Sequence, residues 1–227
     1  MKKLTEDWSI GDLVLYKNNQ LIAFNKPAGI TVQADKSKDK SLLDFAEIYT
    51  KSGIHLIHRI DRPASGLVLF AKTKSALASM NRQFQERSVE KTYLAVVPNL
   101  PKPTEGQLRH YLHKNGRNNK SYAVDANHKA AKEAILEYKV LASIDNYHLL
   151  EIKLLTGRHH QIRAQLAAVS NPIKGDVKYG AKRNNKDRSI HLHSWKLSFT
   201  HPTSEERVKL TADLPKDPVW EAFRDML

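Results

Sequence analysis

The chain has 227 residues, a length that fits one large or two small domains, and a single domain of this size can bury a core without disulfides or structural metals. It contains no cysteine, which excludes thiolate metal sites and a cysteine nucleophile, and its longest apolar run, residues 66–71, is far shorter than the ~18 residues of a membrane span. Its 37 basic residues against 24 acidic ones give a formal net charge of +13, which favours a polyanionic partner, nucleic acid before membrane.

The expected elements begin with a hairpin, since residues 13–16 and 21–25 flank Asn18 and Asn19, which favour a tight turn. Ser41 and Asp44 form a capping box that predicts a helix through residue 49. Helices are further expected over residues 75–87, 159–169 and 219–226, and strands over residues 66–71, 92–97, 134–141, 147–155, 195–200 and 207–210. Many strands with few, irregularly placed helices predict an α+β fold on a largely antiparallel sheet. No linker or repeat divides the chain, so we expect a single domain over residues 1–227.

Two stretches carry much of the charge surplus. Residues 174–188 contain six basic residues against Asp176 and Asp187. Residues 109–133 contain the cations Arg109, Lys114, Arg117, Lys120, Lys129 and Lys132 against Asp125 and Glu133. Both stretches have Gly and Asn at turn-prone positions, which predicts exposed loops or a protruding hairpin. Either stretch alone could be a solvated face, but two on one basic chain favour phosphate contacts.

A dense polar cluster, HRIDRPASG at residues 58–66, leads into the longest apolar run. Asp61 lies between Arg59 and Arg62, whose positive charges favour its ionised form. Arg62 precedes Pro63 and is therefore pushed toward extended geometry, so we expect a stiff loop. Such a carboxylate can act as a nucleophile or base, while composition alone favours a surface turn with an Arg–Asp ion pair.

A second cluster, LTGRHHQIRAQL, occupies residues 155–166. Thr156 is a candidate N-cap, and the helix start would offer free N–H groups to an anion. The predicted helix has one apolar stripe, formed by Ile162, Leu166 and Val169. Arg163 lies at the edge of this stripe, where it can point toward a cleft. The alternative is an ordinary amphipathic helix with basic flanks.

Metal and nucleotide cofactors are not expected. His191 and His193 lie on one face of a predicted strand, but no third ligand with suitable spacing accompanies them. A glycine-rich phosphate-binding sequence is also absent.

Tyr93 alone is more typical of a core than of a functional site, although an aromatic ring beside a cleft can stack on an unpaired base.

These segments, taken together and in order, match short sequence motifs. They are NKPAG at residues 25–29, HRIDRPASG at 58–66, KTY at 91–93, TGRHHQIR at 156–163, PIKGDVKYG at 172–180 and LHSWKLSFTHP at 192–202. The set resembles the RluA family of RNA pseudouridine synthases, whose motifs include HRLDxxTSG, TGRxHQIR and PIxGDxxYG. The resemblance runs from about residue 13 to residue 202.

The resemblance implies a pseudouridine synthase-like α+β fold, with helices flanking a mixed central sheet and a central catalytic cleft. It makes Asp61 the catalytic aspartate, places Tyr93 against the target base and pairs Arg163 with the aspartate. Arg59 would fill the space that a flipped nucleotide leaves, or contact its backbone. The expected substrate-binding residues, from the resemblance and the charge pattern, are Lys26, Arg59, Arg62, Lys114, Arg117, Lys120 and Arg158. Departures from the family pattern at Ile60, Ala64, His159 and Gln165 leave the aspartate, tyrosine and arginine in place.

The implied function is isomerisation of specific uridines in structured rRNA or tRNA, by base flipping, glycosidic bond cleavage and C5–C1′ rejoining. We expect a stand-alone catalytic domain without an S4 RNA-binding domain, acting as a cytoplasmic monomer without metal or cofactor. One alternative is a non-catalytic RNA-binding module or RNA chaperone, which needs no carboxylate in a basic cleft. Another is a carboxylate-dependent glycosidase, which usually needs two acidic residues near each other.

Overall fold

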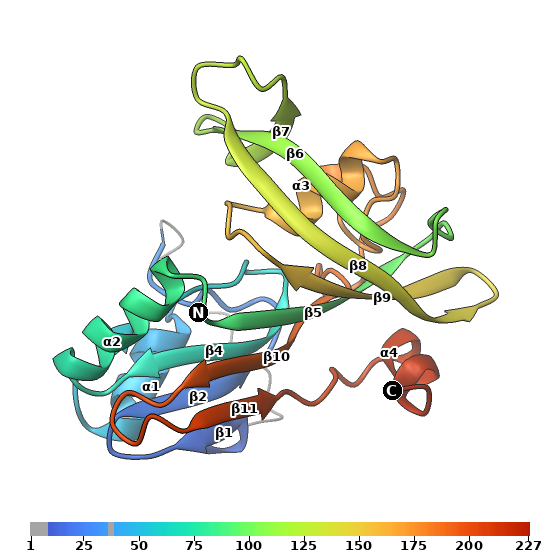
Figure 1. The fold of residues 1–227 in the computed structure, drawn as a ribbon. Coiled ribbons are helices and arrows are strands. Elements are labelled where there is room, and N and C mark those ends of the chain that lie inside the picture. Colours follow the sequence, from blue (N-terminus) through green and yellow to red (C-terminus); the bar gives the residue numbers. More distant parts are fainter. Residues whose placement is uncertain (1–8, 36–38) are drawn as a thin grey trace. The chain divides into compact units, whose positions relative to one another are not determined.

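The computed structural model describes residues 9–35 and 39–227 (Figure 1). Its internal contacts divide the chain into two compact units. The first unit contains the described residues up to Glu90 together with Ser194–Asp213, and the second contains Lys91–His193 together with Leu214–Leu227. The expectation of a single domain stays a prediction. No helix within the described residues has the length and apolar character needed to cross a membrane.

The first unit is built on a sheet with strands in the order β1–β2–β4–β10, to which β3 adds at β4 and β11 at β10. The strands are β1 (Val14–Lys17), β2 (Leu21–Lys26), β3 (His55–Leu56), β4 (Ser65–Ala71), β10 (Leu192–Thr200) and β11 (Arg207–Thr211). The helices are the 3-10 turn η1 (Ile10–Leu13), α1 (Leu42–Thr50) and α2 (Lys74–Gln85).

Local sequence signals explain the first elements. The Asn18 side chain accepts hydrogen bonds from the backbone N–H of Gln20 (2.8 Å) and Leu21 (2.7 Å), which closes the β1–β2 hairpin. Ser41 caps α1, and the Asp44 carboxylate accepts a hydrogen bond from the Ser41 backbone N–H at 2.7 Å. The predicted hairpin and capping box are both confirmed.

The core of the first unit lies between α2 and one face of the sheet. Alternate strand residues pack there against Ala76 and Met80 of α2. These strand residues are Leu21, Ala23, Leu67, Leu69, Leu197, Phe199 and Leu210. Phe24 and Phe70 point to the other face and meet edge to face at 5.9 Å between ring centroids. Because β4 is buried on both faces, its sequence is apolar without alternation.

The second unit contains an antiparallel sheet in the order β5–β9–β8–β6–β7. The strands are β5 (Glu90–Val97), β6 (Glu105–Asn115), β7 (Lys120–Val124), β8 (Lys132–Ile144) and β9 (Tyr147–Leu154). The helices are α3 (Gln161–Ala168), the 3-10 turn η2 (Val177–Tyr179) and α4 (Pro218–Arg224). The basic stretch at residues 109–133 is therefore mainly the β6–β7 hairpin, and α3 packs Ala164 against Leu112 of β6.

The α+β prediction is confirmed, since helices flank the sheets in both units and the strand pairs β1–β2, β2–β4, β5–β9, β6–β8 and β8–β9 are antiparallel. The expected strands are present, and most are longer than predicted, above all β8, which spans Lys132–Ile144. Strand β9 instead ends at Leu154, one residue before its predicted end. The central catalytic cleft stays a prediction.

Candidate active site

Asp61 occupies a turn immediately before β4. Its backbone carbonyl accepts a hydrogen bond from Ala64 N–H at 3.1 Å, and its side chain is half-buried. The preceding Ile60 is buried, so the turn is anchored in the interior on that side. The predicted stiff loop is thus a short, internally bonded turn between a buried residue and a buried strand.

Lys26, the last residue of β2, is hydrogen-bonded to the backbone of the Asp61 turn. Its side chain is fully buried, and Nζ donates to the carbonyls of Ala64 (2.7 Å), Ile30 (2.9 Å), Pro27 (3.0 Å) and Arg62 (3.3 Å). Burial lowers the pKa of Lys26 to about 7, while the charge of Asp61 acts to raise that pKa and the charge of Arg62 to lower it. The expectation that Lys26 binds substrate stays a prediction. In the structure its ammonium donates to backbone carbonyls, and its side chain has no exposed surface.

Arg62 and Gly29 are joined by two reciprocal bonds. Gly29 N–H donates to the Arg62 carbonyl at 2.8 Å, and Arg62 Nε donates to the Gly29 carbonyl at 2.8 Å. Gly29 has a φ of +93°, a left-handed conformation that favours glycine. The Arg62 guanidinium also pairs with Asp39 at 2.7 Å and approaches Asp35 at 3.9 Å. Arg62, expected at the substrate, therefore ties Gly29 and Asp39 to the Asp61 turn.

His58 and Gly66 fix the two sides of the turn. His58 Nε2 accepts a bond from Leu69 N–H at 3.1 Å, and its ring stacks on Phe84 of α2 at 5.3 Å. Gly66 has a φ of +108°, and a Cβ there would lie 2.2 Å from the Ser194 carbonyl oxygen. Only glycine allows this close approach of β4 to β10. Arg59, by contrast, is exposed and available to a ligand.

In the second unit, Arg163 of α3 forms a buried bidentate ion pair with Asp176. Arg163 Nε lies 2.7 Å from Oδ2 and Nη2 lies 2.8 Å from Oδ1, with side-chain exposures of only 4% and 1%. Two parallel charge-assisted bonds fix the plane of the guanidinium. Sequence reasoning missed Asp176, which counted only as an acid within a basic stretch. The GD pair of the PIKGDVKYG motif was the available signal.

Tyr179 at the end of η2 connects Arg163 to β7. The Arg163 guanidinium carbon lies 4.9 Å from the Tyr179 ring centroid, and Lys120 Nζ lies 4.9 Å from the same centroid. The Tyr179 hydroxyl accepts a bond from Ser121 N–H at 2.8 Å and bonds His160 Nδ1 at 2.9 Å. Sequence reasoning also missed this residue.

The start of α3 differs from the prediction. The helix begins at Gln161, and its N-cap is His160 in a left-handed conformation without a side-chain cap bond. Thr156 is not the N-cap, because its hydroxyl accepts from Ile135 N–H at 2.8 Å and donates to Gln161 Oε1 at 2.8 Å. Gln161 thus binds the helix start to β8. Arg158 is half-buried, and its Nε donates to the Glu133 carbonyl at 2.8 Å.

The remaining expected site residues lie in the second unit, on its strands or, for Arg117, in the turn between β6 and β7. Tyr93 is in β5, opposite Ile152 of β9, and is 9% exposed. Lys114 and Arg117 are exposed on the β6–β7 hairpin, and Lys120 lies 5.1 Å over the Tyr122 ring as well as over Tyr179. The hairpin therefore presents cations to solvent, as a phosphate-binding surface requires.

The histidines considered for a metal have other surroundings. Strand β10 begins at Leu192, so His191 precedes it, and the rings of His191 and His193 lie 5.3 and 5.9 Å from the Trp220 ring. Within residues 9–35 and 39–227, no group of three or more His, Asp or Glu side chains is placed to hold a metal ion.

Comparisons with known proteins bear on the site. A family model described as RNA pseudouridylate synthase matches residues 20–168. The ribosomal large subunit pseudouridine synthase C of Rickettsia conorii is 33% identical over 218 residues, which cover 94% of this chain and 70% of the relative. The tRNA pseudouridine synthase C of Haemophilus ducreyi is 30% identical over 237 residues, covering 92% of each. The chain spans about two thirds of the length of other curated relatives, at 67% and 66%.

The fold agrees with these matches. The solved structure of human RNA pseudouridylate synthase domain containing 4 superimposes with a TM-score of 0.76 at 25% identity, covering 95% of this chain and 94% of that one. Fold and sequence together define an RNA-modifying isomerase, an enzyme that converts uridine to pseudouridine. The chain belongs to the RNA pseudouridylate synthase family.

Proposed function

We propose that this chain isomerises uridine to pseudouridine in structured rRNA or tRNA with Asp61 as the catalytic carboxylate. The observation that carries the assignment is the Asp61 turn, which Lys26 and the Gly29–Arg62 pair hold from two sides. A carboxylate on a pre-ordered turn loses little further freedom when it meets a nucleotide. Tyr93 stacks on the target base, and Arg163, oriented by Asp176, pairs with the aspartate.

The reaction needs only rearrangement of the nucleotide. The C1′–N1 bond breaks, the uracil turns within the site, and C5 joins C1′. C5 then loses its proton and N1 gains one, so the product is an isomer of the substrate and no oxidant or reductant is consumed. Asp61 either attacks the nucleotide or balances positive charge at C1′. The chemistry calls for no nucleotide cofactor, and we propose that none is used.

The RNA itself is held by its backbone. The names of two relatives specify ribosomal large subunit RNA and tRNA as their substrates, which supports these two RNA classes for this chain. A uridine within a stem or loop must first be flipped out, at a cost of a few kcal/mol that backbone contacts supply. We propose that Arg59, Lys114, Arg117, Lys120 and Arg158 make these contacts. We also propose that the chain acts as a monomer in the cytoplasm.

The test is Asp61→Asn, which keeps the shape of the side chain but removes its charge. We expect pseudouridine formation to fall below detection, while RNA affinity stays the same or rises because a negative charge that repels phosphate is gone. Asp145→Asn, at an exposed aspartate between β8 and β9, is the matched control and should keep wild-type turnover.

Two results would overturn the proposal. Turnover by Asp61→Asn near the wild-type rate on the same RNA would remove Asp61 from the mechanism. Tight RNA binding by the wild type without any pseudouridine formation would instead identify a non-catalytic RNA-binding module. Pseudouridines are counted in the same purified RNA before and after incubation.

A further inference from the structure

Residues 181–190, here called the Asn185 loop, carry a concentrated positive charge. The loop contains no helix or strand. Four of its side chains are exposed cations: Lys182, Arg183, Lys186 and Arg188. Its one acidic residue, Asp187, accepts bonds from the N–H and hydroxyl of Ser189 at 3.0 and 2.7 Å. The carboxylate is thus engaged within the loop, while the cations face solvent.

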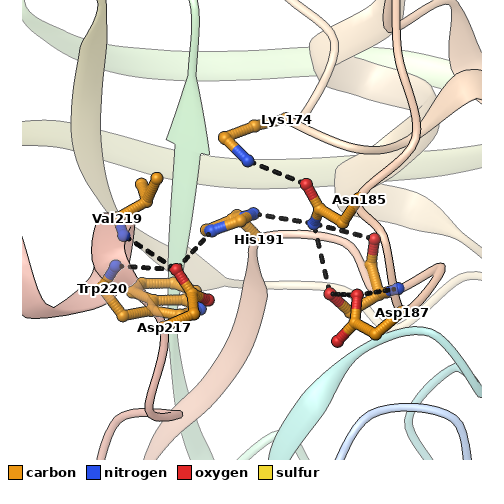
Figure 2. Close-up of polar contacts among 8 residues, drawn as sticks. Lys174, Asn185, Asp187, His191, Asp217, Val219 and Trp220 are labelled. Atoms are coloured by element: carbon orange, nitrogen blue, oxygen red, sulfur yellow. Dashed lines mark hydrogen bonds and ion pairs between the residues drawn. The ribbon is translucent and has the colours of Figure 1, made fainter.

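The loop is ordered around the side chain of Asn185 (Figure 2). Asn185 Oδ1 accepts from Lys174 Nζ at 2.8 Å, and Nδ2 donates to the Ser189 carbonyl at 3.0 Å and meets His191 Nδ1 at 3.0 Å. A Cβ on Gly175 would lie 2.6 Å from Asn185 Nδ2, so glycine makes room for the amide. The backbone closes the loop at its base, where His191 N–H donates to the Lys174 carbonyl at 3.0 Å.

The hydrogen bonds around Asn185 are consistent with only one orientation of its side-chain amide. The Lys174 ammonium can only donate, so it fixes the amide with Oδ1 toward Lys174 and the NH₂ group toward His191. His191 must then accept at Nδ1, which leaves its proton on Nε2, and Nε2–H donates to Asp217 Oδ1 at 3.2 Å. Asp217 is the N-cap of α4 and also accepts from the N–H of Val219 at 2.8 Å (Figure 2). Asn185 is therefore tied to the C-terminal helix.

We propose that Asn185 is a positioning residue that pre-arranges the four cations of the loop for the phosphates of the substrate RNA, with α4 supporting it through Asp217 and His191. The inference rests on the proposed function, since it names a contact surface for the same substrate. Without the hydrogen bonds of Asn185, this irregular loop would have to become ordered when RNA binds. The loss of conformational entropy on ordering would lower the RNA affinity. Ammonium and guanidinium groups held in place bind phosphate through charge-assisted bonds.

The experiment compares Asn185→Ala with Asn184→Ala in the full chain. Asn184 is the exposed neighbour, so the control removes the same amide without removing the hydrogen bonds of Asn185. With a folded tRNA transcript and a folded large-subunit rRNA transcript as probes, we expect Asn185→Ala to raise Kd and KM about tenfold and to leave kcat at saturating RNA within about twofold. Amide hydrogen exchange should accelerate in the Asn185 loop, whereas Asn184→Ala should change none of these quantities.

His191→Phe tests the same link if Asn185→Ala fails to fold. A phenyl ring keeps the stacking on Trp220 but removes both ring nitrogens, so it should raise Kd in the same direction with kcat unchanged. Wild-type Kd in a folded variant with faster loop exchange would overturn the proposal, as would a fall in kcat without a change in Kd. Failure of the proposed function is a different result, because wild-type enzyme would then form no pseudouridine.

Discussion

A lysine in the interior is the least expected residue of this molecule. Lys26 stands in the NKPAG motif, where its charge suggests a contact with RNA, yet its Nζ reaches four backbone carbonyls around the Asp61 turn. Removing an ammonium from water is costly unless polar partners replace the water. The carbonyls supply those partners, and in return their positions are fixed. Lys26 thus stabilises the turn that carries Asp61, the proposed catalytic carboxylate.

The pKa of Lys26 makes a pH-dependent contribution to stability. Its folded value of about 7 lies below the ordinary 10.5, so between these values the unfolded chain binds more protons than the folded one. The free energy of unfolding therefore rises with pH across this window and loses that gain as pH falls toward 7.

Lys26→Met removes this titration, so its unfolding free energy should show less of the rise between about pH 7 and pH 10. Near pH 7 the variant should also be less stable by about 2–4 kcal/mol, because buried carbonyls lose their donor. Urea denaturation at several pH values measures both effects. Lys209→Met, at an exposed lysine of β11, serves as control and should follow the wild type. A Lys26→Met profile parallel to that of the wild type would contradict the assigned pKa.

At the scale of elements, α3, η2 and β7 meet at Tyr179. The ring lies against the Arg163 guanidinium, and the hydroxyl bonds Ser121 of β7. The two halves of one side chain thus serve two purposes. The ring supports the orientation of Arg163, while the hydroxyl fixes the basic hairpin relative to the helix that carries Arg163.

The variants Tyr179→Phe and Tyr179→Leu separate these purposes. The phenylalanine keeps the ring, so kcat should stay near wild type while KM for RNA rises about three- to tenfold, the scale of one lost hydrogen bond. The leucine also removes the ring from Arg163 and should lower kcat. Steady-state kinetics give both constants. Tyr138→Phe, which loses a hydroxyl bond to the Pro103 carbonyl, controls for the loss of a phenol elsewhere. Equal losses of kcat in the two Tyr179 variants would show that the ring has no separate role.

Local signals predicted the elements well, and long-range contacts explain what they missed. The Asn18 turn and the Ser41 cap involve neighbours within three residues, so the sequence displays both partners. The prediction of Thr156 as an N-cap was wrong, because its hydroxyl accepts a hydrogen bond from the N–H of Ile135, which is 21 residues away. Burial is equally invisible in a motif, and nothing local distinguishes the buried Lys26 from an exposed lysine.

In the candidate site too, motifs within a short segment were recognised and contacts between distant segments were missed. The motif resemblance identified Asp61, Tyr93 and Arg163, whose roles stay predictions. Asp176, which lies 13 positions after its partner Arg163, was missed because pairing at that separation depends on the fold. The predicted contact of Arg62 with RNA stays a prediction, and the bonds from its guanidinium to Gly29 and Asp39 were not visible in the sequence.

At the scale of the whole molecule, the surplus of basic residues governs the encounter with RNA. Replacing Lys114, Arg117 and Lys120 together by Gln should weaken RNA binding and reduce the slope of log Kd against log salt by about 2–3, since up to three fewer counterions are released. Binding is measured over a range of salt concentrations. A triple replacement of the exposed Lys139, Lys153 and Lys216 is the charge-matched control. Equal slopes for the two triple variants would assign the hairpin to general surface charge.

The division of each unit into two chain segments has a consequence for synthesis on the ribosome. The first unit needs β10 and β11, whose Leu197, Phe199 and Leu210 complete its core, and these strands are made after the whole middle of the chain. The second unit in turn needs α4, whose Trp220 covers His191. The first unit cannot finish folding until residues 194–213 have emerged, and the second cannot finish until residues 214–227 have emerged. A premature stop after residue 193 would thus leave both units incomplete. It would remove Leu197, Phe199 and Leu210 from the core and expose part of that apolar surface to chaperones and proteases.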